Sequence, residues 1–211
     1  MNNIGKFAIF LVLLTGLSVF SFADTFLGFS IGSFRLSEQF DNDYGRELDG
    51  VNFNIDFNYF PGKFPLGVFV RGSAGASISA YEWTESEMSS LDIFSLTDLR
   101  LSVGPIFKII SGPKIAIPIS LGPSIATYRE EDYYYNASVQ ETINIGLFAD
   151  AAVLFIPVRW FYIKAGVSAT WEFLQYERRG IKMESRYNFF KDYSYSALDL
   201  CIYSGIGIRF E

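Results

Sequence analysis

The sequence predicts an all-β protein: an eight-stranded antiparallel up-and-down transmembrane β-barrel preceded by a cleaved signal peptide. Three observations lead to this fold class. Eight stretches alternate apolar with polar residues, the connections between them alternate between short and long, and the first 23 residues have the composition of a secretory signal. A chain of 211 residues is long enough for one such domain.

The N-terminal segment is expected to direct export. Lys6 precedes an apolar run, and Ser21 and Ala23 place small residues at the two positions that a signal peptidase reads. We therefore expect residues 1–23 to be a signal peptide and residues 24–211 to form the barrel domain. The one cysteine, Cys201, follows far behind the apolar run, so neither a lipid anchor there nor an intrachain disulfide is expected.

The eight alternating stretches have the length of membrane-spanning strands. In the second, Val51, Phe53 and Ile55 alternate with Asn52 and Asn54. A tilted strand needs about 9–11 residues to cross a bilayer, and each stretch provides roughly this number. The eight stretches are residues 26–34, 51–60, 66–80, 98–108, 114–128, 143–155, 163–172 and 198–210.

The connections predict the barrel's two ends. "PGKFP", "IISGPK" and "IPVRW" are compact and rich in Gly or Pro, as tight turns are. The remaining four are longer and polar, and short turns at one end with long loops at the other are typical of outer-membrane barrels. We expect the long loops at residues 35–50, 82–95, 129–141 and 174–192.

The apolar face is expected to meet lipid. None of the eight stretches places a charge on that face, while the other face is mainly Gly, Ser, Asn and Ala, which suit a narrow interior. A secreted soluble barrel of lipocalin type is the alternative, and it would turn the apolar face inward. Aromatic residues near the strand ends predict two interfacial girdles, composed of Tyr59, Phe60, Phe155, Trp160 and Tyr162 by the short turns and Trp83, Tyr128, Trp171 and Tyr176 by the long loops.

Charged residues on the polar face predict a luminal network. Five acids and five bases balance there, which favours salt bridges that satisfy buried groups. If the "PGKFP" turn centres near Lys63 and Phe64, Asp56 and Arg71 lie opposite each other and pair. A gated polar path for small solutes is the alternative reading of the same charges. The predicted network comprises Asp56, Arg71, Asp98, Arg100, Lys108, Asp150, Lys164, Glu172, Asp199 and Arg209.

Composition argues against several functions. A net charge of −6 without a Lys/Arg cluster argues against a nucleic-acid partner. The absence of His weighs against Ser–His and Cys–His catalysis and against His-ligated metals. We therefore expect no enzyme activity, no metal and no cofactor, with an enzyme that uses carboxylates alone as a distant third alternative.

The end of the sequence, "YSGIGIRF", provides a family resemblance. Its Tyr203, Gly205, Ile208 and Phe210 resemble the C-terminal insertion signal of bacterial outer-membrane proteins, although Glu211 follows the aromatic residue. From residue 24 onward the chain resembles the small eight-stranded barrels of the OmpA, OmpX and OmpW group. The resemblance implies an outer-membrane location, contact with outer-membrane lipid and folding by the barrel-insertion machinery, and we expect a monomer.

The expected function is a structural or surface-interaction role, with an extracellular ligand at the loops as a further expectation. The first three long loops are acidic, the fourth leans basic, and loops on rigid scaffolds often bind partners. A narrow channel for small solutes, or OmpW-like passage of apolar ligands, is the alternative.

Overall fold

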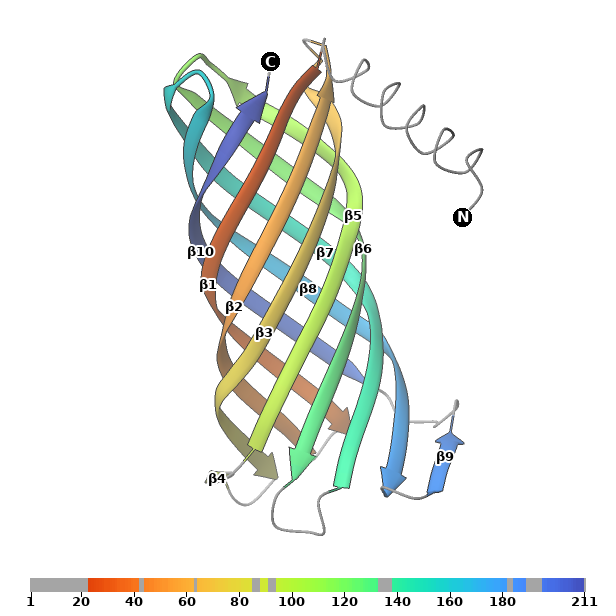
Figure 1. Cartoon of the computed structure of the whole chain (residues 1–211). Helices are drawn as coiled ribbons and strands as arrows, with labels where there is room; N and C mark the ends of the chain where they lie inside the picture. Colours follow the sequence, from red (N-terminus) through yellow and green to blue (C-terminus); the bar gives the residue numbers. More distant parts are fainter. Residues whose placement is uncertain are drawn as a thin grey trace, which may run out of the picture.

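The computed structural model describes residues 23–41, 44–62, 64–84, 88–90, 94–132, 138–181, 184–188 and 195–210. The signal peptide therefore lies almost entirely outside the described residues and stays a prediction. Within the described residues, eight long strands form the wall, and two short strands pair antiparallel with the ends of β3 and β8 (Figure 1). The strands are β1 (Ala23–Asp41), β2 (Tyr44–Pro61), β3 (Leu66–Thr84), β4 (Met88–Ser90), β5 (Phe94–Ser111), β6 (Ile115–Asp132), β7 (Ser138–Val158), β8 (Phe161–Ile181), β9 (Glu184–Asn188) and β10 (Ser196–Phe210).

Pairing of the last strand with the first closes the barrel. β10 is antiparallel to both β1 and β8, and each other long strand pairs with its sequence neighbours. Following the paired residues once around the barrel from Gly28 leads to Glu38, ten residues further along β1. With eight strands this stagger corresponds to a strand tilt of about 40°. The predicted eight-stranded antiparallel barrel is confirmed.

The strands are longer than predicted. Much of each expected long loop continues as strand, so the loop bounds drawn from polarity were wrong. The first case shows why: Arg35 and Asp49 are polar, yet they lie opposite each other on β1 and β2 and form an ion pair of 2.8 Å. A 19-residue strand at this tilt spans about 48 Å along the barrel axis, more than the ~30 Å of the hydrocarbon core.

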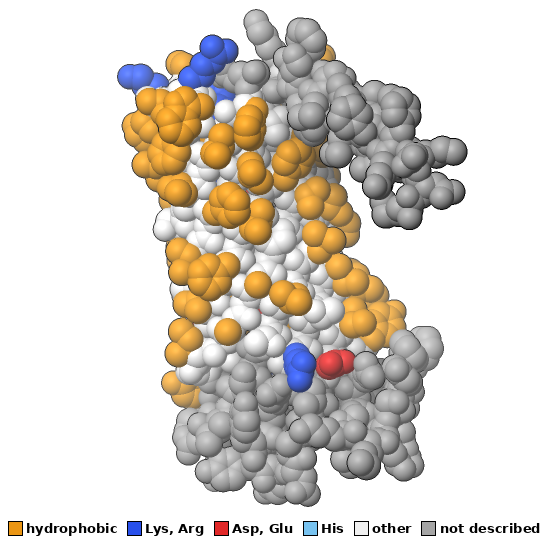
Figure 2. Space-filling view, in the orientation of Figure 1, with side chains coloured by type: hydrophobic (Ala, Val, Ile, Leu, Met, Phe, Trp, Pro, Cys, Tyr) orange, Lys and Arg blue, Asp and Glu red, His pale blue; other side chains and the backbone are white. Residues whose placement is uncertain are grey.

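The two faces of the strands separate as the alternation predicted. Phe53 is 61% exposed and Ile202 is 71% exposed, whereas Asn54 and Asn144, on the other face, are buried. Figure 2 shows hydrophobic side chains spread over the outer wall, with charged ones near the two ends of the described surface. The soluble lipocalin-type alternative was wrong, because the apolar face points outward. Among the described residues, no helix is long and apolar enough to cross a membrane.

The assignment of three aromatic residues to the interfacial girdles was wrong. Phe60, Tyr128 and Tyr162 are each at most 3% exposed and face the lumen, because they share the strand parity of the polar side chains. Phe155, Trp160 and Trp171 are exposed outward, and Tyr59 and Tyr176 are half-buried. The side chain of Trp83 lies outside the described residues.

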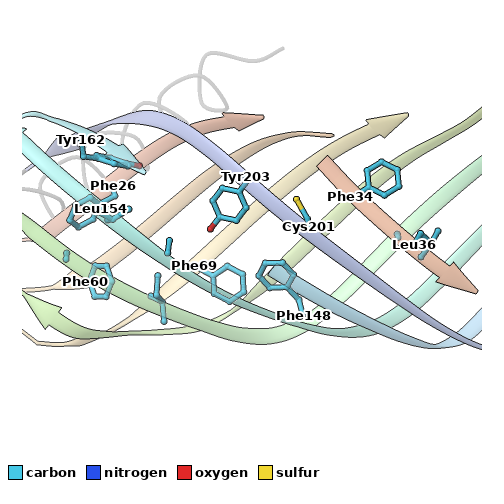
Figure 3. Close-up of a cluster of buried hydrophobic side chains, with 14 of the residues drawn as sticks. Phe26, Phe34, Leu36, Phe60, Phe69, Phe148, Leu154, Tyr162, Cys201 and Tyr203 are labelled. Carbon is cyan, nitrogen blue, oxygen red and sulfur yellow. The ribbon is translucent and has the colours of Figure 1, made fainter. Parts of the chain in front are cut away.

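The luminal aromatics form the apolar part of the interior. Phe26 packs edge-on against Phe60 and Tyr162, with ring centroids 6.0 and 5.5 Å apart. Figure 3 shows these rings with Leu154 at one end of the barrel, and Phe69, Phe148, Tyr203 and Cys201 further along it. Polar side chains fill the space between these apolar groups.

Candidate functional site: the barrel lumen

Charged side chains in the lumen form three layers along the barrel axis. All ten residues of the sequence-predicted network are among them, and Asp24, Glu38 and Arg46 join them. The inner layer, near the short turns, is Asp24, Lys108 and Arg209; the central layer is Asp56, Arg71, Asp150 and Lys164; the outer layer, toward the long loops, is Glu38, Arg46, Asp98, Arg100, Glu172 and Asp199.

The inner layer is held by one carboxylate. Asp24 at the start of β1 accepts hydrogen bonds from Lys108 Nζ at 2.5 Å and from Arg209 Nε at 2.8 Å. The Lys108 ammonium also lies 3.9 Å from the centroid of the Phe60 ring, a cation–π distance. The first and last strands are thereby tied to β5 across the inner mouth.

The central layer is electrically neutral. Arg71 lies directly opposite Asp56 in the β2–β3 register and forms an ion pair with it. The same guanidinium donates to Asp150 Oδ1 at 2.8 Å and to Tyr203 Oη at 3.1 Å, and Tyr203 Oη donates to Asp150 at 2.6 Å. Lys164 forms a second ion pair with Asp56. Two cations and two carboxylates therefore balance within one connected group.

Aromatic rings hold the Arg71 guanidinium from two sides. Its Cζ lies 5.0 Å from the centroid of Phe148 and 4.8 Å from that of Tyr203. Since a guanidinium is planar and weakly hydrated, such stacking stabilises it away from water. The lumen at this level contains packed rings and ion pairs.

The outer layer centres on Arg100. This side chain forms ion pairs with Asp199, with Glu172 at 3.0 Å and with Asp98 at 3.8 Å. It also donates to Tyr128 Oη at 2.7 Å, which in turn donates to Glu172 at 2.7 Å. Because β5 and β10 lie on opposite walls of the closed barrel, the Arg100–Asp199 pair crosses the lumen.

A second branch connects the outer layer to the segment before β10. Arg46 pairs with Glu38 directly across from it, and Tyr195 Oη donates to Glu38 at 3.1 Å. Asn144 donates to Tyr195 Oη and to Glu172, each at 2.7 Å. The outer layer contains four carboxylates and two guanidiniums, so its described side chains have a net charge of −2.

The charged side chains of the lumen bind mainly to one another. Among the residues that the structure describes, no set of His, Cys, Asp and Glu side chains converges as metal ligands do. Asp98 and Asp199 each keep one buried carboxylate oxygen without a hydrogen-bond donor. Asp98 pairs with Arg100 of its own strand, and the other charged residues of the network each have an ion pair with a residue of another strand.

Sequence reasoning missed part of the network for an identifiable reason. Glu38 and Arg46 were assigned to a loop, although they share the parity of the luminal residues Leu36 and Leu48. Asp24 was placed beside the signal peptide and given no role. Continuing the alternation past Arg35 and back past Asp49 would have identified Glu38 and Arg46, and extending it back from Phe26 would have identified Asp24.

The predicted C-terminal signal residues fall on both faces of β10. Tyr203 is a luminal residue of the central layer, whereas Ile208 and Phe210 are exposed on the outer wall. Gly205 packs closely against β1, where an added Cβ would clash with the Phe29 carbonyl oxygen. Their part in membrane insertion stays a prediction.

Solved structures of outer-membrane proteins share this architecture. No family model and no curated protein matches the sequence. A major outer membrane protein from Thermus thermophilus matches with a TM-score of 0.59 at 11% identity, over 89% of this chain and 99% of that chain. OprG from Pseudomonas aeruginosa matches with a TM-score of 0.56 at 11% identity, over 90% and 97%. Neisserial surface protein A matches with a TM-score of 0.53 at 11% identity, over 88% and 97%.

These similarities establish the fold. The expected resemblance to small outer-membrane barrels is confirmed at that level, at identities too low to transfer a ligand or a role. The exposed apolar belt adds the physical argument, since a wall of Phe, Leu and Ile on every strand requires a hydrocarbon environment. The fold and the belt together indicate a protein of the outer membrane.

Proposed function

We propose that this protein is a non-conducting, non-catalytic structural barrel of the outer membrane, which acts through the outer ends of its strands and the loops between them. The observation that carries the proposal is the set of ion pairs that cross the lumen. Arg71 connects β3 to β7, and Arg100 connects β5 to β8 and β10. An eight-stranded barrel has an interior just wide enough for side chains, so such bridges occupy the space that a pore needs.

Energetics support a permanently closed lumen. Each of the cations Arg71, Arg100 and Lys164 is buried and paired, and separating such a pair leaves uncompensated charges in a medium of low dielectric constant. Opening a path would require breaking several of these contacts together. The acidic and Tyr-rich loop sequences support a role at the cell surface, where rigid barrels present their variable segments.

Planar-bilayer conductance tests the proposal. The refolded wild-type protein should be silent, and Arg71→Ala combined with Arg100→Ala should produce openings because both layers lose their central cation. Arg35→Ala is the matched control, since Arg35 faces outward and its loss leaves the lumen filled. Steady wild-type openings would overturn the proposal and favour a narrow channel for small solutes.

One observation favours a second candidate, sideways passage of apolar molecules through the wall. The β5–β6 ladder has no paired residues between Ser102–Ser124 and Ile106–Ser120, although the register is the same on both sides of this interval. Pro105 lies in this interval and Pro123 lies opposite it, and proline has no N–H to donate to a ladder.

A reversible crosslink tests this candidate. The Ser102 and Ser124 hydroxyls are 3.0 Å apart across the two strands, so Ser102→Cys with Ser124→Cys, in a Cys201→Ser background, can close the interval with a disulfide. Flux of an apolar dye into vesicles should fall on oxidation and return on reduction if the wall opens there. Flux equal to that of protein-free vesicles would remove this candidate.

A further inference from the structure

The short turns at the inner end of the barrel share one charge pattern. "PGKFP", "IISGPK" and "IPVRW" each contain one Lys or Arg and no Asp or Glu, within a chain of net charge −6. In the described residues these cations are Lys114, between β5 and β6, and Arg159, between β7 and β8, and both are exposed. Figure 2 shows basic side chains at this end of the barrel, beside a group of hydrophobic ones.

The two turns form one continuous surface. The carbonyl oxygen of Lys114 accepts a hydrogen bond of 2.8 Å from the backbone N–H of Ile156, three residues before Arg159. The carbonyl oxygen of Trp160 in turn accepts one of 2.9 Å from the backbone N–H of Arg209. In Figure 1 the green β5–β6 turn and the cyan β7–β8 turn lie next to each other at the end of the barrel where the C-terminus lies.

The apolar residues beside Lys114 and Arg159 indicate how deep these two cations lie in the membrane. Arg159 is flanked in the sequence by Val158, which is 46% exposed, and by Trp160, which is 63% exposed. Ile115, next to Lys114, is 46% exposed. These apolar side chains belong to the lipid-facing belt, and an exposed Trp at its edge is typical of the membrane–water interface. Long basic side chains at this level extend their charges into the head-group region.

Two groups of basic side chains lie at this end. Lys108 and Arg209 are held by Asp24 at the inner mouth of the lumen, and Lys114 and Arg159 are exposed on the outer surface. An apolar belt that ends in exposed cations is complementary to a lipid with a negatively charged head group and an acyl chain.

We propose that Lys114 and Arg159, with Trp160 between the head group and the belt, form a binding surface for anionic phospholipid in the inner leaflet of the outer membrane. The phosphate of the head group contacts the two cations, and the acyl chains lie along Val158 and Ile115. This inference concerns the outer wall and holds whether or not the lumen conducts.

Fluorescence quenching by brominated lipid tests the surface. A variant with Trp160 as its sole tryptophan, made by Trp83→Phe and Trp171→Phe, is refolded into phosphatidylcholine vesicles in which a fixed fraction of phosphatidylglycerol is present. In one sample the phosphatidylglycerol has brominated acyl chains, and in the other the phosphatidylcholine has them. The mole fraction of brominated lipid is the same in both samples. Quenching by brominated phosphatidylglycerol should exceed that by brominated phosphatidylcholine about two- to fivefold, as expected for one or two interfacial cations.

Two controls make the result specific. A variant with Trp171 as its sole tryptophan reports on the opposite end, where the exposed Arg35 is paired with Asp49, and should show no preference between the two lipids. Lys114→Gln with Arg159→Gln should bring the Trp160 ratio to about one, as should 1 M NaCl if the double variant does not refold. Equal quenching of Trp160 by the two lipids, or a preference that survives both the double substitution and salt, would overturn the proposal.

Discussion

Arg71 Nη1 donates a hydrogen bond of 2.8 Å to Asp150 Oδ1, and this contact joins β3 to β7 through the interior of the barrel. The two residues are 79 positions apart in the chain. Arg71 also pairs with Asp56 and Tyr203, so one guanidinium connects four strands. Buried pairs of this kind are weak evidence of net stability, yet removing one partner is costly because the other charge stays buried.

Arg71→Ala should lower the free energy of unfolding by about 3–5 kcal/mol, since Asp150 would lose its cation. The measurement is urea-induced unfolding of the barrel in lipid vesicles, followed by tryptophan fluorescence. Arg35→Ala, which breaks an exposed pair of the same chemistry, should lower the free energy of unfolding far less, because water screens that pair. Equal losses for the two variants would contradict the buried role of Arg71.

Arg100→Ala should convert the outer layer into an acidic constriction. Asp98, Glu172 and Asp199 would remain without their shared cation, so any openings should be cation-selective. The reversal potential under a KCl gradient measures this selectivity. Arg100→Lys retains the positive charge and should stay silent, and anion-selective openings of the Ala variant would show that other groups line the path.

Gly122→Ala should destabilise the barrel by about 1–3 kcal/mol, the usual cost of inserting atoms into a packed site. An added Cβ would clash with the Val103 carbonyl oxygen, where β5 and β6 approach each other closely. Gly72→Ala is the matched control, because no atom lies within 4 Å of its added Cβ. The two variants are compared by the temperature at the midpoint of the heat-induced shift in gel mobility. A midpoint for Gly72→Ala that is lower than that for Gly122→Ala would contradict the prediction.

Cys201 should be protected from a maleimide reagent in the folded barrel. Its side chain is 4% exposed in the lumen, and its Sγ accepts a hydrogen bond from Asn52 at 3.3 Å. Labelling, followed by mass spectrometry, should be complete in urea and very slow in vesicles. Combining Arg71→Ala with Arg100→Ala should accelerate it, because both neighbouring layers open. Rapid labelling of the folded wild-type protein would mean that the lumen admits solutes.

Much of the fold could be predicted because its signals are local. A strand alternates its side chains with a period of two, so the pattern from Val51 to Phe60 identifies both a strand and its lipid-facing side without knowledge of any neighbour. Compact turns add the register of each hairpin, and for this reason Asp56 and Arg71 could be placed opposite each other from the sequence. Polarity was a poor guide to where strands end, as Arg35 and Asp49 demonstrate, because a cross-strand ion pair maintains the ladder beyond the membrane.

The sequence by itself determined the eight strands, the faces they turn to lipid and the residue types that fill the lumen, since each depends on neighbours within one strand or hairpin. Only the tertiary structure decided which luminal groups meet. Pairs such as Arg100 with Asp199 depend on the stagger accumulated around the closed barrel, and a different stagger would bring other residues to the same level. The same closure turned Phe60, Tyr128 and Tyr162 from expected girdle residues into the packing of the interior, because a narrow lumen must be filled by whichever side chains point into it.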